Sequence, residues 1–468
     1  MEASSIRTLR DVFWGDLTQK LVFVVFVALN LLLMLFSVPD GPYVAAADVG
    51  VSIEPVRGLL AGEGFTHPDG QLYTWGTPLF PMFLAVLLGL LPWKAALYSI
   101  VVVQCALLYA IGLFTRRLAD FYSPKVATLA QSLVVFNPNL LITSHLLQTE
   151  IIFTFFLTAG VVALLSFRDS PTWSRAALVG LLFGLATLVR PVRQFVVLLL
   201  PLLFVLLGEW KERRLRSRNL AAGFTAAVIA LLTISPWVVR NQVMFGTPFL
   251  TANAGWYLED QYRQLLHNGH GMSNADTKAQ AEARVMEKLP GLKMNREELG
   301  SMPRNEQSRI LSSIYLDAIL DVEVAVHPKA IVMSLLELYF SGGASNFRNY
   351  LGIDGKQAVV QYQGESRSGL FDPVSRLFSQ IGFGYAFLLA VTLSFAIVMR
   401  VAGIVGLIGS LRSEKFSPVW IYLAIMGVLT LSYLYLGQSR FRIPLEPYLA
   451  VLAATGIAML RDRFGNSG

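Results

Sequence analysis

The chain is poor in the residues that build soluble domains and metal centres. Of its 468 residues only 15% are charged, five are histidine and one is cysteine. Soluble domains carry roughly 25% charged residues, so this composition excludes an ordinary soluble protein. The single cysteine, Cys105, excludes a disulfide framework and a thiolate metal site. The sequence has no P-loop and no glycine-rich nucleotide fingerprint. We therefore expect no nucleotide cofactor and no nucleic-acid partner.

Apolar runs take the place of the missing charges. Hydrophobic residues make up 54% of the chain, and a helix of about 20 apolar residues crosses a bilayer. Ten strong runs lie near residues 21–38, 95–114, 126–143, 151–167, 176–189, 194–208, 220–238, 380–399, 418–437 and 443–460. Two shorter runs, 79–92 and 330–341, predict interfacial or re-entrant segments. The sequence thus predicts an all-α polytopic membrane protein with about ten to twelve transmembrane helices.

Basic residues predict the orientation, because Lys and Arg near helix ends stay cytoplasmic. They cluster at Arg7/Arg10/Lys20, Arg116/Arg117/Lys125, Arg168/Arg175, Lys211–Arg218, Arg400/Arg412/Lys415 and Arg461/Arg463. With ten spans, all six clusters fall on the side of both termini. We therefore expect a multi-pass protein of the cytoplasmic (inner) membrane with both termini cytoplasmic. Residues 39–94 and 239–379 would then lie outside.

The same pattern divides the chain into four parts. These are a cytoplasmic segment 1–20, a membrane module 21–240 that includes the outer loop 39–94, an extracytoplasmic region 241–329, and a C-terminal part 330–468. The last part combines an interfacial segment with further spans. The charged stretch 268–309 predicts amphipathic helices over the membrane surface. Gly180 and Gly184, four residues apart, predict close helix packing.

Several arginines contradict the positive-inside pattern. Arg190 and Arg193 lie at a predicted outer turn, Arg240 follows the run 220–238, and Arg440 and Arg442 precede the last run. An arginine in the membrane costs about 2.5–3.5 kcal/mol, so such residues usually face a cavity and a partner. Each one alone could instead extend to the lipid headgroups. Three such sites on one face favour an anionic ligand, and a lipid phosphate is the natural candidate.

Two acids are predicted on the same face. Asp48 follows the first apolar run, and Glu150 begins another run at its outer end. A carboxylate there could serve as a general base, and Asp48 with Glu150 could hold a divalent metal cation. A solvated loop acid and a helix N-terminal acid are the alternatives. His67 and His145 could line the same site, but without metal-ligand spacing we interpret them as structural.

Several different short motifs follow one another along the chain. Asp48, Arg57, Gly62, Gly64 and Phe65 are followed by Thr77-Pro78-Leu79-Phe80-Pro81, Leu147-Gln148-Thr149-Glu150, Ala186-Thr187-Leu188-Val189-Arg190-Pro191, Pro236-Trp237-Val238-Val239-Arg240-Asn241 and Ser439-Arg440-Phe441-Arg442-Ile443-Pro444. Together they resemble integral-membrane glycosyltransferases of the GT-C class. The resemblance is to the branch that contains protein O-mannosyltransferases and aminoarabinose transferases of lipid A.

The resemblance implies a GT-C fold and an enzyme that uses a polyprenyl-phosphate-linked sugar donor. The acceptor hydroxyl would belong to a glycolipid, a polysaccharide or a protein on the extracytoplasmic face. Asp48 would be the catalytic base of an inverting displacement. Arg190, Arg240, Arg440 and Arg442 would bind the donor phosphate, and Glu150, Arg57, His145 and Tyr257 would complete the site.

The predicted site is an amphiphilic cavity at the outer membrane boundary near Asp48. Residues 39–94 and part of 239–379 would roof it, the run 79–92 would form one wall, and Thr251–Tyr257 would help to close it. A transporter or flippase of lipid-linked glycans is one alternative, but it would favour paired cytoplasmic charges and repeated halves. A non-catalytic assembly subunit is another.

Overall fold

The computed structural model describes residues 17–46, 49–67, 70–191, 194–207, 213–353, 382–412 and 418–465. Within these ranges the chain is helical, and its β pairing is an isolated bridge between Thr66 and Leu72. The membrane module contains α2 (Leu17–Leu35), α3 (Gly41–Val44), α4 (Val49–Ala61), α5 (Leu79–Leu90), α6 (Trp93–Tyr122), η1 (Pro124–Val126), α7 (Ala127–Val135), α8 (Pro138–Ser144), α9 (Glu150–Asp169), α10 (Trp173–Val189), α11 (Gln194–Leu198), α12 (Leu200–Val205) and α13 (Arg213–Phe245).

The second half of the chain adds a lobe and a return to the bundle. Its helices are α14 (Ala254–His270), α15 (Asn274–Lys288), η3 (Leu289–Leu292), α16 (Arg296–Ser301), α17 (Arg304–Leu320), α18 (Val326–Phe340), α19 (Ala344–Leu351), α21 (Phe383–Leu411), α22 (Val419–Leu431), η6 (Ser439–Leu445) and α23 (Glu446–Gly465). The all-α class predicted from composition is confirmed for this part of the chain.

Six helical segments of the described ranges are long and apolar enough to cross a membrane: Leu17–Leu35, Trp93–Tyr122, Glu150–Asp169, Ser217–Phe245, Phe383–Leu411 and Ser439–Phe464. A seventh arises if α7 and α8, bent by 53°, form one span. The bend has a local cause, because Pro138 cannot continue a helical hydrogen-bond ladder and Asn137 caps α8. The expected count of ten to twelve spans is therefore not confirmed.

The missing spans are apolar runs that fold as shorter helices. The run 194–208 contains the two short helices α11 and α12, and the run 418–437 contains the 13-residue α22. The 17-residue α10 is also below the length of a full span. The predicted interfacial run 79–92 forms α5, an apolar helix of 12 residues. Hydrophobicity alone identified these segments as apolar, but it did not predict that they would fold as shorter helices.

Small residues bring two pairs of helices into close contact. A Cβ atom on Gly180 of α10 would overlap the carbonyl oxygen of Ala226 in α13. One on Gly184 would lie 2.7 Å from the Cβ atom of Thr233. This confirms the close packing predicted from the Gly180 and Gly184 spacing. The structure adds a second such crossing, where a Cβ atom on Gly456 of α23 would overlap the backbone of α21.

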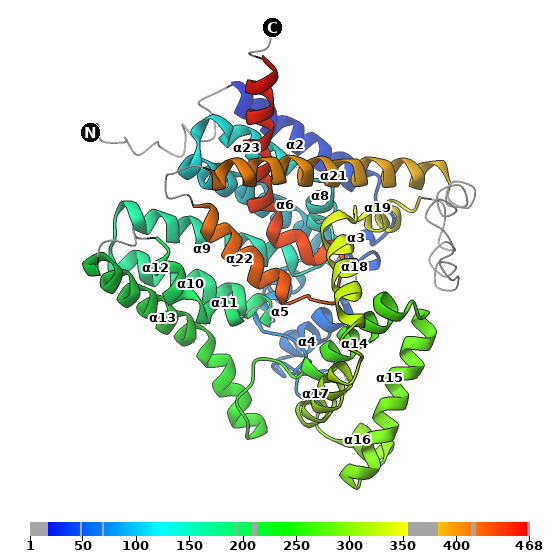
Figure 1. Cartoon of the computed structure of the whole chain (residues 1–468). Coiled ribbons are helices and arrows are strands. Elements are labelled where there is room, and N and C mark those ends of the chain that lie inside the picture. Colours follow the sequence, from blue (N-terminus) through cyan, green and yellow to red (C-terminus); the bar gives the residue numbers. More distant parts are fainter. Residues whose placement is uncertain are drawn as a thin grey trace.

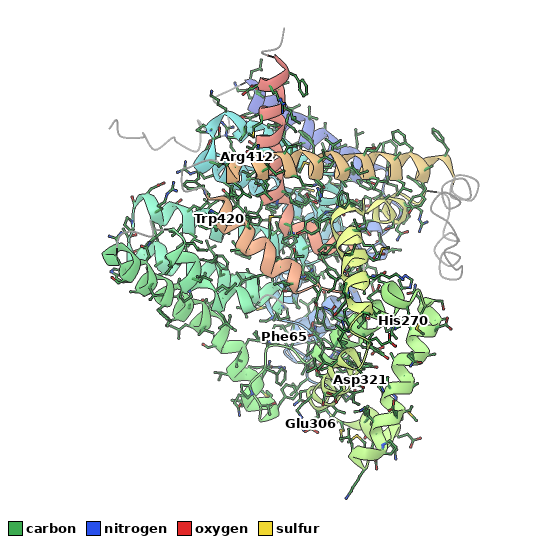
Figure 2. The ribbon with its side chains drawn as sticks, viewed as in Figure 1. Phe65, His270, Glu306, Asp321, Arg412 and Trp420 are labelled. Carbon is green, nitrogen blue, oxygen red and sulfur yellow. The ribbon has the colours of Figure 1, made fainter. Side chains whose placement is uncertain are left out.

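The helices α14–α17 form a lobe at one end of the bundle (Figure 1, lower right). The lobe has its own core, which includes Leu265, Val285, Leu311 and Ile314. The amphipathic helices predicted for the charged stretch 268–309 are thus confirmed as helices. His270, Glu306 and Asp321 lie in this lobe, whereas Arg412 lies at the other end of the molecule (Figure 2).

Candidate functional site

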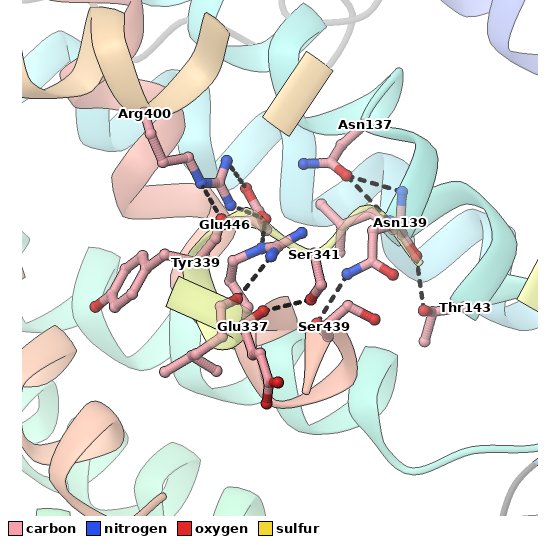
Figure 3. A network of polar contacts seen from close by, with 12 residues as sticks. Asn137, Asn139, Thr143, Glu337, Tyr339, Ser341, Arg400, Ser439 and Glu446 are labelled. Atoms are coloured by element: carbon pink, nitrogen blue, oxygen red, sulfur yellow. Dashed lines mark hydrogen bonds and ion pairs between the residues drawn. The ribbon is translucent and has the colours of Figure 1, made fainter. Parts of the chain in front are cut away.

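Three turns of the bundle bring charged side chains together. Glu150 is the first residue of α9, Arg190 directly follows α10, and Arg440 lies in η6 between α22 and α23. Asn139 of α8 fixes η6 in this position by donating to the Ser439 carbonyl at 2.8 Å (Figure 3). Because these turns follow α8, α10 and α22, the packing of those three helices decides where the three charges meet.

An ion pair forms the centre of this group. The Arg190 guanidinium Nη1 pairs with Glu150 Oε1 and also donates to Thr149 Oγ1 at 3.0 Å. The Glu150 side chain is 4% exposed and that of Arg190 is 15% exposed. Arg440 is close enough to act electrostatically on Glu150, and Tyr433 interacts with Arg190. We call Glu150, Arg190 and Arg440 the charge triad. Two guanidiniums against one carboxylate leave an excess of one positive charge.

Aromatic side chains support the triad from the C-terminal side. The rings of Tyr433 and Phe441 stack with centroids 4.1 Å apart, and the Arg440 guanidinium lies 4.8 Å from the Phe441 centroid. Tyr257, from lobe helix α14, donates its hydroxyl to the Ser432 carbonyl of the same turn. The structure therefore places the predicted site residue Tyr257 beside Tyr433, and the lobe contacts the turn that carries Arg440.

A second ionic group lies next to the triad and is fully buried (Figure 3). Arg442 donates through Nε to Glu446 Oε1 at 2.6 Å and through Nη1 to the Leu338 carbonyl at 2.6 Å. Arg400 binds the same carboxylate at 2.6 Å and donates to the Tyr339 carbonyl at 2.9 Å. We call Arg400, Arg442 and Glu446 the buried trio. Its guanidiniums satisfy carbonyls at the end of α18, which lack helical partners.

The trio corrects one expectation and adds residues that sequence reasoning missed. Arg400 was expected in a cytoplasmic basic cluster, but it lies inside α21, which continues to Leu411. The helix tolerates this arginine because Glu446 compensates its charge. A sequence signal existed only for the pair Arg442 and Glu446, whose spacing of four residues suits a helical ion pair.

Arg240 joins the hairpin that contains the Thr66–Leu72 bridge to the end of α13. Its guanidinium donates to the Tyr73 carbonyl at 3.0 Å and to the Phe65 carbonyl at 3.2 Å. It also lies over the rings of Trp237 and Phe245, at 4.8 and 5.6 Å from their centroids. These contacts occupy the guanidinium with protein groups. Within the described ranges, these contacts do not join Arg240 to the charge triad.

Arg57 lines a cavity of about 480 Å³ in the first outer segment. The other walls include Tyr43, Leu60, Leu88 and Trp93, and the rings of Tyr43 and Trp93 meet edge to face at 5.4 Å. Leu88 belongs to α5, so the apolar run 79–92 does form one wall of a cavity there. A largely apolar lining with one guanidinium suits an anionic amphiphile.

His145 has partners away from the charge triad. Its Nδ1 lies 3.0 Å from the Tyr350 hydroxyl of α19, and its Nε2 lies 2.9 Å from Asn30 Oδ1 of α2. The side chain is completely buried. These contacts connect α2, α8 and α19.

Asp48 and Arg193 lie outside the described residues. Nothing in the structure therefore tests the predicted base or its pairing with Glu150 in a metal site. Among the residues that the structure does describe, no group of three His, Cys, Asp or Glu side chains could hold a metal ion. At Glu150 itself the two guanidiniums disfavour a cation, so we derive no step through a metal.

A protein-family model matches the part of the chain that contains Glu150 and Arg190. Residues 76–239, which are 164 of the 468, match the model of the dolichyl-phosphate-mannose-protein mannosyltransferase family. This stretch includes Glu150 and Arg190 but ends before Arg240. A search of curated protein sequences finds no match.

Comparison with solved structures extends over nearly the whole chain. The oligosaccharyltransferase of Archaeoglobus fulgidus in its apo form aligns with a TM-score of 0.52 and 14% identity. The archaeal oligosaccharyltransferase AglB from the same organism, in complex with an inhibitory peptide and a dolichol-phosphate, aligns with a TM-score of 0.50 and 14% identity. Each alignment covers 96% of this chain and 51% of the other, so this chain spans about half the length of those proteins.

ArnT from Cupriavidus metallidurans bound to undecaprenyl phosphate overlaps less well. Its TM-score is 0.37 at 14% identity, with 93% of this chain and 78% of that chain covered. The fold of this chain is similar to that of the two archaeal structures.

Proposed function

We propose that the chain is a membrane glycosyltransferase of the GT-C class that uses a polyprenyl-phosphate-linked sugar, because its fold is similar to that of the archaeal oligosaccharyltransferases. The observation that carries this proposal is the charge triad, whose excess positive charge lies at the meeting point of three turns. Two of its members, Glu150 and Arg190, lie inside the stretch that matches a mannosyltransferase family. The dolichol-phosphate bound to the archaeal relative gives an example of such a lipid on this fold.

Arg190 and Arg440 are the residues that we propose to contact the donor phosphate. Both are partly exposed, and the pair outweighs the single charge of Glu150. Preorganised cations stabilise the negative charge that develops on a leaving phosphate. Arg240 and Arg442, also predicted as ligands, donate to carbonyls and to Glu446. We propose that Arg240 positions the hairpin and that Arg442 positions η6. Both arginines would then affect phosphate binding only indirectly.

The chemical step we propose is a single inverting displacement. The acceptor oxygen attacks the anomeric carbon, the bond from that carbon to the phosphate oxygen breaks, and the polyprenyl phosphate leaves with the electron pair. The acceptor proton passes to the Asp48 carboxylate. Asp48 directly precedes α4, the helix that carries Arg57 into its cavity. This proximity in sequence supports an acceptor that enters through the Arg57 cavity from the extracytoplasmic side.

A transfer assay tests the proposal. Purified full-length protein is mixed with polyprenyl-phosphate sugars and with glycolipid, polysaccharide or peptide acceptors, and both the glycosylated product and the released polyprenyl phosphate are measured. We expect transfer by the wild type, and a loss of about 10²–10⁴-fold for Asp48→Asn, because that is the usual contribution of a general base. Near-normal turnover by a folded Asp48→Asn protein would show that Asp48 is not the base.

Binding of the donor tests the phosphate ligands separately. Arg190→Ala and Arg440→Ala should weaken donor binding more than acceptor binding, and Arg440→Lys should restore it only in part because lysine lacks the bidentate fork. Unchanged donor affinity in both alanine variants would contradict the assignment. Movement of the lipid across a bilayer without any glycosylated product would instead favour the transporter.

A further inference from the structure

A narrow groove runs along the surface between α18, α21, α22 and α23. Its volume is about 300 Å³, at the lower end of small-molecule sites. Its lining is aliphatic or aromatic except for Arg400 and the hydroxyl of Tyr339, and it includes Leu336, Ile404, Met426 and Leu452. Ile404 is 55% exposed and Leu336 is 48% exposed, so the groove is open on one side. A lining of this kind accepts hydrocarbon and excludes a sugar.

The groove leads toward the charge triad. Tyr339, which lines one end, packs on the cluster that contains Tyr433 and Phe441. Those two rings in turn contact the triad, since Tyr433 interacts with Arg190 and Phe441 lies under Arg440. Along the chain, Met426 of the groove precedes Tyr433 by seven residues, which is about two helical turns. A single aromatic layer thus separates the groove from the cations.

Charge also distinguishes the two ends of the groove. Arg400 lies at the end near Tyr339 and belongs to the buried trio, in which two guanidiniums face one carboxylate. That end therefore carries an excess of one positive charge, added to that of the triad. A molecule with an anionic head and a hydrocarbon tail would be held with its head toward this end. An uncharged lipid would gain nothing from the arrangement.

We propose that this groove binds the first isoprenoid units of the polyprenyl-phosphate donor while its phosphate contacts the triad. The inference rests on the proposed function and adds to it a specificity for the lipid chain. The isoprenoid chain of the donor moves into the groove from lipid and not from water. The groove therefore stabilises the bound donor through packing contacts and not through the full hydrophobic effect. The expected gain is therefore modest, and it should be confined to donors long enough to reach the groove.

The test uses two donors with the same sugar, one on a long polyprenyl chain and one on a two-carbon ethyl chain, which is too short to reach the groove. Leu336→Trp and Ile404→Trp each fill the groove from a partly exposed wall. The matched control is Val398→Trp, on the same helix as Ile404, 60% exposed and outside the groove. We expect both groove variants to raise KM for the long-chain donor about 3–10-fold, with the short-chain donor and the control unchanged.

Two results would overturn the groove assignment and leave the proposed function standing. One is a groove variant that behaves like Val398→Trp with both donors. The other is an equal loss for both donors in folded protein, which would mean a structural disturbance of the nearby triad.

Labelling makes the proposal independent of turnover. A polyprenyl phosphate with a photoreactive diazirine in its second isoprenoid unit should label peptides of α18, α21 or α23, and Ile404→Trp should reduce that labelling. Labelling confined to other helices would refute the groove. If the wild type transfers no sugar from any donor, the proposed function fails, and labelling still decides whether the groove binds this lipid.

Discussion

Replacing Glu150 by glutamine should affect stability and donor binding in opposite directions. The substitution keeps the shape of the side chain and removes one negative charge from a site that is almost closed to solvent, with Glu150 4% and Arg190 15% exposed. Arg190 then loses its ion-pair partner but keeps Thr149 and Tyr433. The excess positive charge of the triad rises from one to two.

Both magnitudes follow from the geometry. Removing one partner of a buried pair costs about 3–5 kcal/mol, and the remaining contacts of Arg190 favour the lower value. For a chain of 468 residues, 1 kcal/mol corresponds to roughly 1 °C, so the apparent Tm should fall by about 3 °C. A phosphate about 6 Å from the lost charge, at an effective dielectric constant of about 20–40, gains about 1.4–2.8 kcal/mol. Binding should therefore tighten about 10–100-fold.

The assay measures thermal unfolding and the binding of sugar-free polyprenyl phosphate on the same purified protein. Glu306→Gln serves as the control, because Glu306 is an exposed acid of the lobe (Figure 2) and an exposed charge contributes little. The reasoning is refuted if Glu150→Gln weakens lipid binding at an unchanged Tm. That outcome would mean that Glu150 itself contacts the substrate.

Three further predictions concern stability. Glu446→Gln should lower the apparent Tm more than Glu150→Gln, because it leaves Arg400 and Arg442 buried without a carboxylate; equal Tm values would show that the trio stabilises nothing beyond one pair. Gly180→Leu should destabilise the protein by at least about 1–3 kcal/mol through overlap with α13, whereas Gly427→Leu, which has open space, should not. Burial, followed by the nearby Asp260 carboxylate, raises the pKa of Glu259 above its ordinary value. The stability present at low pH is then lost as pH rises through this raised pKa, so Glu259→Gln should raise the Tm at pH 7 and leave it unchanged below about pH 4; a pH series of melting curves checks this.

Local patterns were enough to predict the all-α class and one contact between helices, but not the length of every helix. Gly180 and Gly184 lie one turn apart on a face that the structure packs against α13, and the polar stretch beyond His267 forms the helices of the lobe. The outer arginines and Glu150 were predicted to converge because they contradict the normal distribution of charge. That argument succeeded for Arg190 and Glu150, which form an ion pair.

The sequence could not show which partner each buried charge would find. Arg400 and Glu446 are 46 residues apart, and Arg400 lies at the end of an apolar run, where arginine is normally cytoplasmic. Only the crossing of α21 and α23 brings the two side chains together. Arg240 is a similar case, since its partners are the backbone carbonyls of Phe65 and Tyr73. Every residue has a backbone carbonyl, so the sequence does not indicate which one will accept a hydrogen bond.

The length of α13 sets how far the hairpin bound by Arg240 lies from the first residue of the helix. From Arg213 to Arg240 the helix rises about 40 Å at 1.5 Å per residue, whereas the hydrocarbon core is about 30 Å thick. Arg240, at the far end, binds the hairpin carbonyls directly. Removing one helical turn between these two arginines would therefore move the hairpin about 5.4 Å closer to Arg213. The position of the hairpin along the bundle thus depends on the length of a single helix.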